Sequence, residues 1–328
     1  CVRLLAEGGS FGSFGGDFGV SLLTGSVSQK LSGGYTQSDG GTKNSDFKRR
    51  RAYYTGSYTS RYADLVWQAG LSSQDYGAST FYSAKFDNQW EATRRIITSA
   101  QADIKPFGDE RLVITPQAYW HRDVDHYQLT RGKEGAKNGE NYHRTDVYGA
   151  SLNAHATWLL GKTAVGMDIR KEHILSTAYG DLLPENEWKD IHGTDRRYDH
   201  RGDRTNTSLF LEHNVILGGF TLSAGVLANR NTGLDGDFRF YPGVDISYRP
   251  NEMWKFYASW NKALRVPTYT DLYTSNSVQQ GDTGLRPERT STFKAGTRFR
   301  TRGVEAVVSG FYSKGNDIID WVYETEES

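Results

Sequence analysis

The stretch Trp254–Glu288 reads WKFYASWNKALRVPTYTDLYTSNSVQQGDTGLRPE, and its beginning decides the fold class. Apolar residues occupy every second position, and polar residues or tyrosine lie between them: Trp254, Phe256, Ala258 and Trp260 against Lys255, Tyr257, Ser259 and Asn261. Successive side chains of a strand point to opposite faces, so the pattern predicts a strand with one apolar and one polar face. A polar loop follows directly, and the chain becomes extended again after Pro287.

The composition is that of a strand-rich protein without spanning helices. The 328 residues carry 39 basic and 39 acidic side chains, so no basic stripe is available for a nucleic acid. Mean hydropathy is −0.65, and no apolar run approaches the roughly 20 residues of a membrane helix. Aromatic residues make up 13% of the chain and glycines number 36, which favours strands and turns.

Alternation of this kind recurs along the whole chain in segments of roughly 10 to 14 residues. Its apolar positions include Leu65, Trp67, Ala69 and Leu71; Val165, Met167 and Ile169; Leu209, Leu211, Val215 and Leu217; and Phe220, Leu222, Ala224 and Val226. Charged residues fall only on the opposite face, as in a barrel whose outside meets lipid and whose inside is wet. The pattern predicts about 15 strands, with a further strand beginning near Trp321.

The connections between these segments alternate in length. Short turns are predicted at 24–25, 62–63, 107–109, 161–162, 218–219, 250–251 and 301–303. Longer polar connections lie between them, at about 38–48, 77–89, 125–145, 174–202, 230–236 and 265–287. Tight turns at one end and long loops at the other are typical of an all-β, transmembrane, antiparallel up-and-down barrel.

The quoted stretch closely resembles the signature of TonB-dependent outer-membrane receptors. The matching residues are Arg265, Pro267, Thr268, Asp271, Leu272, Tyr273, Leu285, Pro287 and Glu288. The resemblance implies a plugged barrel of 22 strands in the outer membrane of a Gram-negative bacterium. It also implies active import of a scarce nutrient, with the TonB energy-coupling complex acting through the plug.

Within that family, residues 1–328 correspond to a partial barrel domain. We expect the chain to be a fragment that lacks both the plug and the C-terminal strands. Cys1 is the only cysteine, which excludes an internal disulfide. We interpret it as the point where a truncated sequence begins rather than as a lipid-anchored residue.

A second resemblance concerns the nutrient. The segments 76–83 and 87–93 read YGASTFYS and DNQWEAT, which are similar to cobalamin-receptor-like members found in Bacteroidetes. This resemblance implies cobalamin as the substrate, with a ferric siderophore as the alternative. Haem receptors use a loop histidine near the signature. The segment 265–288 contains no histidine, which argues against haem as the substrate.

Aromatic loop residues are the candidates for substrate contact because they supply rigid contact area to a large ligand. They are Tyr76, Phe81, Tyr82, Trp90, Tyr269 and Tyr273. Signature residues such as Arg265 and Pro267 are expected to hold the loop geometry instead. Trp67, Trp158 and Trp254 lie near turn ends and are assigned to the membrane interface.

No cofactor is expected, apart from a weak calcium hypothesis. Hard cations bind several oxygen ligands, and four loop carboxylates are candidates: Asp39, Asp46, Asp75 and Asp87. Their spacing does not resemble a dedicated calcium loop, so solvated loop acids are the simpler interpretation.

Two other classes of protein remain as alternatives. A barrel enzyme could use Asp123, Asp125 and His126 as an acid–base cluster. A passive porin or adhesive barrel would also show the strand pattern, but would not be expected to carry the signature. We therefore predict a transport receptor and no catalytic residues.

Overall fold

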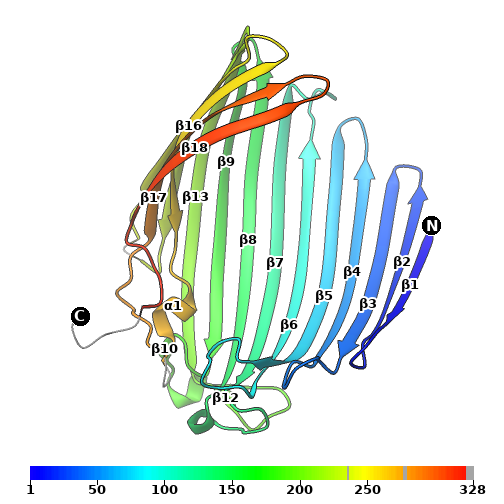
Figure 1. The fold of residues 1–328 in the computed structure, drawn as a ribbon, viewed down its shortest axis with the longest axis vertical. Coiled ribbons are helices and arrows are strands. Elements are labelled where there is room, and N and C mark those ends of the chain that lie inside the picture. Colours follow the sequence, from blue (N-terminus) through cyan, green and yellow to red (C-terminus); the bar gives the residue numbers. More distant parts are fainter. Residues whose placement is uncertain (235, 276–278, 323–328) are drawn as a thin grey trace.

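The structure is a computed structural model that describes residues 1–234, 236–275 and 279–322. Within that part, fifteen strands form one antiparallel sheet in chain order (Figure 1). They are β1 (Val2–Gly8), β2 (Phe14–Thr24), β3 (Val27–Ser38), β4 (Phe47–Thr59), β5 (Ala63–Ser79), β6 (Gln89–Ile104), β7 (Leu112–Gln128), β8 (Glu140–Trp158), β9 (Gly161–Ser176), β13 (His200–Leu217), β14 (Phe220–Asn231), β15 (Arg239–Tyr248), β16 (Trp254–Arg265), β17 (Glu288–Arg300) and β18 (Glu305–Asn316). The predicted all-β architecture and strand number are confirmed.

Short elements occupy the long connections. They comprise η1 (Ala136–Asn138), β10 (Asp181–Leu182), η2 (Glu185–Glu187), β11 (Lys189–Asp190), β12 (Arg197–Tyr198) and α1 (Tyr269–Tyr273). β10 pairs with β13, and β11 pairs with β12. The long connections gather at one end of the sheet, at the bottom of Figure 1, which we call the loop end. The tight turns lie at the opposite, turn end.

The strands extend further into the loop end than the sequence predicts. The regions 125–145 and 174–202 were expected to be loops, yet Asp125 pairs with His143 and Arg201 pairs with Leu175. Polar residues on both faces remove the alternation there, although the backbone ladder continues. The predicted strand near Trp321 is wrong within the described residues, because β18 ends at Asn316 and 317–322 contains no strand.

The two faces of the sheet differ in chemistry, as the alternation predicts. Leu211 lies opposite Val165 on β9 and Val226 on β14, and all three side chains are exposed. Because paired residues share a face, these residues belong to one continuous apolar band. The residues at the intervening positions, among them Asp168 and Glu212, lie on the other face. An exposed apolar band of this extent marks contact with a membrane or a partner.

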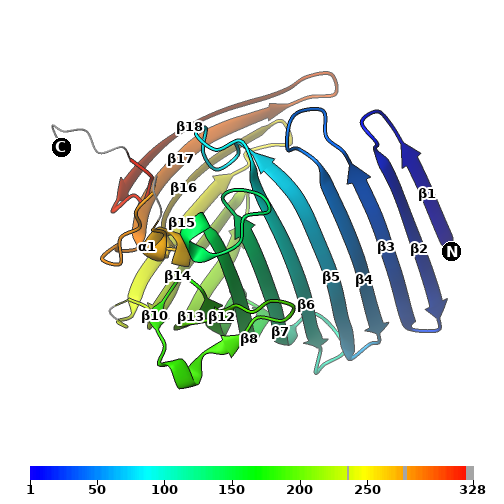
Figure 2. The same cartoon turned by 90° about the horizontal axis from the view of Figure 1, so that it is seen from below.

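The sheet is curved, and Figure 2 shows it as an open arc viewed from the loop end. Polar side chains line the concave face and the apolar band covers the convex face. None of the helices in the described ranges is long and apolar enough to cross a membrane.

From Leu183 to Tyr198, the connection after β9 folds back over the convex face at the loop end. A small apolar core forms between this connection and strands β8 and β9: Tyr142, Leu175, Leu183, Ile191 and Tyr198, with Trp188 packed against it. The indole of Trp188 donates a hydrogen bond of 2.9 Å to the carbonyl of Leu183. This core fixes the connection against the outer wall.

One irregularity interrupts the ladder between β5 and β6. The register shifts between Gly77 and Ser79, and Ser79 has a left-handed φ of 42°. The bulge lies at the loop end of β5, just before the connection 80–88.

Candidate functional site

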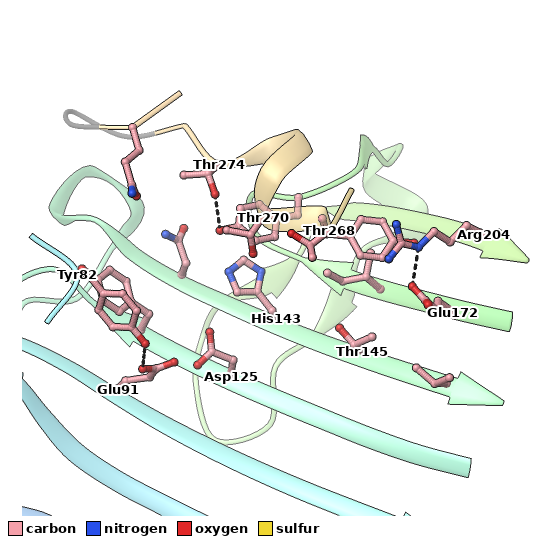
Figure 3. A pocket seen from close by; sticks show the side chains of 17 residues that line it. Tyr82, Glu91, Asp125, His143, Thr145, Glu172, Arg204, Thr268, Thr270 and Thr274 are labelled. Atoms are coloured by element: carbon pink, nitrogen blue, oxygen red, sulfur yellow. Dashed lines mark hydrogen bonds and ion pairs between the residues drawn. The ribbon is translucent and has the colours of Figure 1, made fainter. Parts of the chain in front are cut away.

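A cavity of about 550 Å³ opens on the concave face at the loop end (Figure 3). Its walls come from β6, β7, β8, β9 and β13, from the connection after β5, and from the segment that carries α1. Cavities of this size, with convergent polar groups, are the usual setting of ligand binding. The segments that meet here are up to about two hundred residues apart in the chain, so only the curvature of the sheet brings them together.

Hydrogen-bond acceptors form one side of the cavity. Glu91 is buried and accepts hydrogen bonds from the hydroxyls of Tyr76 and Tyr82. Asp125 lies on the neighbouring strand, and its Oδ1 is buried without a hydrogen-bond partner among the described residues. Burial and the bond to Glu91 raise the pKa of Tyr82 well above its usual range, so this hydroxyl keeps its proton. Asp125 Oδ1 thus has hydrogen-bonding capacity that no described residue uses.

His143 contributes a donor to the same cavity. Ser176 Oγ accepts hydrogen bonds from the backbone N–H groups of Ala178 and Tyr179, at 2.9 and 2.7 Å. Since both lone pairs are then used, the hydroxyl hydrogen is assigned to His143 Nδ1, 2.7 Å away. A neutral imidazole in this tautomer carries its own hydrogen on Nε2. The ring is held flat against Tyr179, with centroids 4.2 Å apart.

Arg204 joins the sheet to the segment that carries α1. Its Nε donates to Glu172 Oε2 at 2.5 Å, and its Nη1 donates to the carbonyl of Pro267 at 2.6 Å. The guanidinium also lies over the ring of Tyr269, 4.6 Å from the centroid. Burial raises the pKa of the Tyr269 hydroxyl above its ordinary value. A second contact joins the same segment to the connection after β9: the hydroxyls of Tyr179 and Thr274 lie 3.1 Å apart.

The signature residues form a compact bracket at the edge of the cavity. Arg265 pairs with Asp271 at 3.1 Å and with Glu288 at 3.3 Å, linking the end of β16 to the start of β17. Thr268 caps α1, and its side chain and that of Asp271 each accept a backbone N–H of the other residue. The remaining members lie around this bracket: Pro267 and Pro287 are buried, and Leu272, Tyr273 and Leu285 are half-buried.

The six aromatic candidates do not converge on one place. Tyr82 and Tyr269 line the cavity, and Tyr76 and Tyr273 lie directly behind them. Phe81 is 77% exposed, although its ring contacts that of Tyr82. Trp90 lies on the convex face, where it packs edge-on against His126. Their role in substrate binding stays a prediction.

The four calcium candidates lie apart from one another. Asp46 pairs with Arg131 and Asp87 with Lys43, at 2.6 Å each. Asp75 lies 4.0 Å from Arg50. Asp39 lies beside Gly12 in the connection after β3. No group of three or more metal-ligating side chains occurs among the described residues. The calcium hypothesis likewise stays a prediction.

The structure also separates the acid–base cluster considered for an enzyme. His126 points to the convex face and bonds Glu140 at 2.8 Å, whereas Asp123 pairs with Arg95 on the concave side. Sequence reasoning did not assign binding roles to Glu91, His143, Glu172 and Arg204. Each of these residues lies on the polar face of its strand, which the alternation could have indicated. They were missed because the ends of these strands were predicted to be loops.

Comparison with known proteins shows the family of the chain. Residues 4–327 match the family model described as TonB dependent receptor-like, beta-barrel, so the chain belongs to this family. TonB-dependent receptors are transporters and not enzymes. Membership implies the outer membrane of a Gram-negative bacterium.

Solved structures share the fold at low sequence identity. The FrpB iron transporter from Neisseria meningitidis, in its apoprotein form, matches with a TM-score of 0.73 and 16% identity over 97% of this chain and 54% of that one. A mutant of the ferric enterobactin receptor PfeA from Pseudomonas aeruginosa gives 0.70 and 14% over 96% and 52%. The copper transporter OprC gives 0.73 and 15% over 97% and 53%. The chain thus spans about half the length of these structures.

Proposed function

We propose that this chain is part of the barrel domain of an outer-membrane receptor that binds cobalamin at the loop end and imports it with energy supplied through TonB. The plug through which TonB would act is part of this proposal. The concave cavity is the binding site, and the loop end faces the outside of the cell. Cobalamin exceeds the cavity in size, so the cavity would hold one edge of the ligand and the long connections the remainder.

The charge of the cavity lining carries the proposal. Glu91 and Glu172 supply carboxylates, Asp125 adds a carboxyl group, and Arg204 is the only Lys or Arg side chain among the described lining residues. That cation is already paired with Glu172. The corrin ring of cobalamin bears primary amides around its edge, and amides donate hydrogen bonds to carboxylates. An anionic ferric chelate would instead meet like charge in a partly dry site, which is unfavourable.

The first test is equilibrium binding of cyanocobalamin to outer membranes that contain the complete receptor, with excess ferric siderophore as competitor. Tight binding that the siderophore does not displace is expected. Absence of cyanocobalamin binding by a folded receptor would refute the cobalamin proposal.

The second test uses Asp125→Ala, which removes the carboxyl group from the cavity wall. Because a hydrogen bond to the ligand is lost, cyanocobalamin affinity is expected to fall about tenfold. Asp168→Ala is the matched control, since Asp168 lies on the same face but does not line the cavity. Equal effects of the two variants would show that Asp125 has no particular role.

A ferric siderophore is the second candidate, favoured by solved structures of similar fold that include a ferric enterobactin receptor and a ferric citrate transporter. It makes the opposite prediction for the same variant. Removing the carboxyl group of Asp125 would not weaken the binding of an anionic chelate, because such a ligand offers this group no hydrogen-bond donor.

A further inference from the structure

Two carboxyl groups lie side by side in the wall of the concave cavity (Figure 3). They belong to Glu91 on β6 and Asp125 on β7. Asp125 pairs with Thr93, two residues along from Glu91, so the two side chains are diagonal neighbours on one face of the sheet. Arg94 and Arg144 face outward at this level, which places the pair beyond the apolar band.

The pair holds one proton between its two groups, which lie within hydrogen-bonding distance of each other. An ionised carboxylate only accepts hydrogen bonds, so a bond between two carboxyl groups requires a proton on one of them. Asp125 Oδ1 is buried, and no N–H or O–H group of the described residues donates to it. A proton shared between Asp125 and Glu91 satisfies this oxygen.

No cation offsets the charge of the pair within the described residues. Arg204 is the only Lys or Arg side chain in the described lining of the cavity, and it pairs with Glu172 instead. Two like charges at this distance in a partly dry site do not both ionise readily. The pair therefore keeps its proton.

Asp125 is the member that carries the proton. Glu91 accepts hydrogen bonds from the hydroxyls of Tyr76 and Tyr82, and such donors stabilise its ionised form. Burial and the nearby charge of Glu91 raise the pKa of Asp125 to about 8. Asp125 is thus protonated at neutral pH and ionises as the pH rises further.

The other titratable groups that face Asp125 do not change charge in this range. Tyr76 on β5 and Tyr82 in the next connection have a pKa raised well above the ordinary value, chiefly by burial. Burial also raises the pKa of Tyr127, on β7, to about 12 and lowers that of His143, on β8, to about 4. A pH response of the cavity near pH 8 therefore reports the carboxyl pair.

We infer that the nutrient displaces the shared proton: N–H groups of the bound ligand donate to the carboxyl group of Asp125, and its proton leaves to the solvent. The inference rests on the proposed function, because the amides at the edge of the corrin ring supply these N–H donors. The proton is the only species released, and the site gains one negative charge that the ligand's donors offset.

The direction of the pH dependence follows from the hydrogen bonds. An N–H group binds an ionised carboxylate more strongly than a protonated carboxyl group. The ligand therefore lowers the pKa of Asp125, and by linkage its affinity is low below the lowered pKa and rises with pH until Asp125 is ionised in the free site as well.

The first measurement is cyanocobalamin binding by the complete, detergent-purified receptor, at about two pH units below and two above the pKa of Asp125. The affinity should rise about tenfold between the two conditions. Asp125→Asn has no carboxyl proton to release, so at both pH values it should bind as weakly as the unaltered receptor does at the lower one. Glu91→Gln removes the neighbouring charge and should move the midpoint of the rise to lower pH.

The matched control is Asp168→Asn, which removes a carboxyl group from the same face outside the cavity. This variant should keep the full rise in affinity. It also accounts for any effect of pH on the ligand itself.

The second measurement detects the shared proton without any ligand. A protonated carboxyl group has an infrared C=O stretching band that a carboxylate lacks. The ligand-free receptor should lose such a band as the pH rises through about 8. Asp125→Asn should show no loss in this range, whereas Asp168→Asn should behave as the unaltered receptor does.

The outcomes separate this inference from the proposed function. Cyanocobalamin affinity that stays constant or falls with rising pH would overturn the inference and leave the proposed function standing. An equal rise in Asp125→Asn, or an infrared spectrum without the expected loss, would also overturn it. Absence of cyanocobalamin binding at both pH values would refute the proposed function and, with it, the displacement by a corrin amide; the shared proton would then be decided by the infrared band alone.

Discussion

Single residues hold the concave site together across long stretches of sequence. Arg204 contacts Glu172 on β9, the carbonyl of Pro267 and the ring of Tyr269 at the same time. Its side chain is only 13% exposed and that of Glu172 only 11%. Arg170 lies 3.0 Å from the other oxygen of Glu172, so the loss of Arg204 is costly chiefly because Glu172 Oε2 and the carbonyl of Pro267 lose their donor.

Arg204→Ala is therefore expected to destabilise the receptor by about 2–3 kcal/mol and to weaken nutrient binding. Arg204→Lys should recover stability more than binding, because an ammonium can pair with Glu172 but cannot reach the Pro267 carbonyl and stack on Tyr269 as well. The measurements are the temperature of the heat-induced mobility shift on gels and the dissociation constant. Arg230→Ala, at an exposed residue, is the control. Identical behaviour of the Ala and Lys variants would contradict this role.

At the scale of elements, neighbouring connections are tied to one another at the loop end. Arg131, after β7, pairs with both oxygens of Asp46, before β4, at 2.6 and 3.0 Å. Asn44 donates to the carbonyl of Gln89 at 2.6 Å, which attaches the start of β6 to the same group. The connections 39–46, 80–88 and 129–139 thus form one joined unit rather than three separate loops.

This joined unit should depend on pH. The hydrogen bond from Arg131 holds the pKa of Asp46 below its ordinary value near 3.8, so the contact is fully present above that pH. It is lost as the pH falls through the lowered pKa of the folded state. Both side chains are more than a third exposed, so the contribution is about 0.5 kcal/mol.

The measurement is hydrogen exchange of the backbone amides at 129–139 in the unaltered receptor and in Asp46→Asn. The variant should exchange faster at pH 7, and the ratio of the two rates should approach one in strong acid. A ratio that does not change with pH would contradict the assignment.

The structure explains which features the sequence could predict. Alternation over 254–260 gave the correct strand and the correct apolar face, because period two directly reports the two sides of a sheet. The contact between Arg204 and Pro267 could not be predicted, since its 63-residue separation is closed by the curvature of the whole sheet. His143 was interpreted as a loop residue because polar neighbours on both faces obscure the end of β8.

At the scale of the whole molecule, the convex band and the concave lining make opposite demands on adjacent residues. Leu211 faces outward within the band, and the next residue, Glu212, faces inward and bonds Ser223 and Asn214. Burial in lipid and exposure to a wet lumen thus alternate at every step along β13.

Leu211→Arg and Glu212→Arg place the same side chain one position apart on opposite faces. A charge facing lipid near the midplane costs about 2–4 kcal/mol, so only Leu211→Arg should strongly reduce the folded receptor in outer-membrane fractions. Glu212→Arg should assemble nearly normally. Comparable yields for the two variants would contradict the assignment of the convex face to lipid.

The strictly sequential order of the sheet has a consequence for errors. Each strand pairs with the strand before it. The register of one strand therefore decides which residues of the next strand face lipid and which face the lumen. One residue gained or lost in a central ladder would exchange the roles of every later position and turn Asp168 and Glu212 toward lipid. The extra residue between Gly77 and Ser79 is tolerated because it lies at the loop end of β5. The connection that follows can absorb the shift in register before β6 begins.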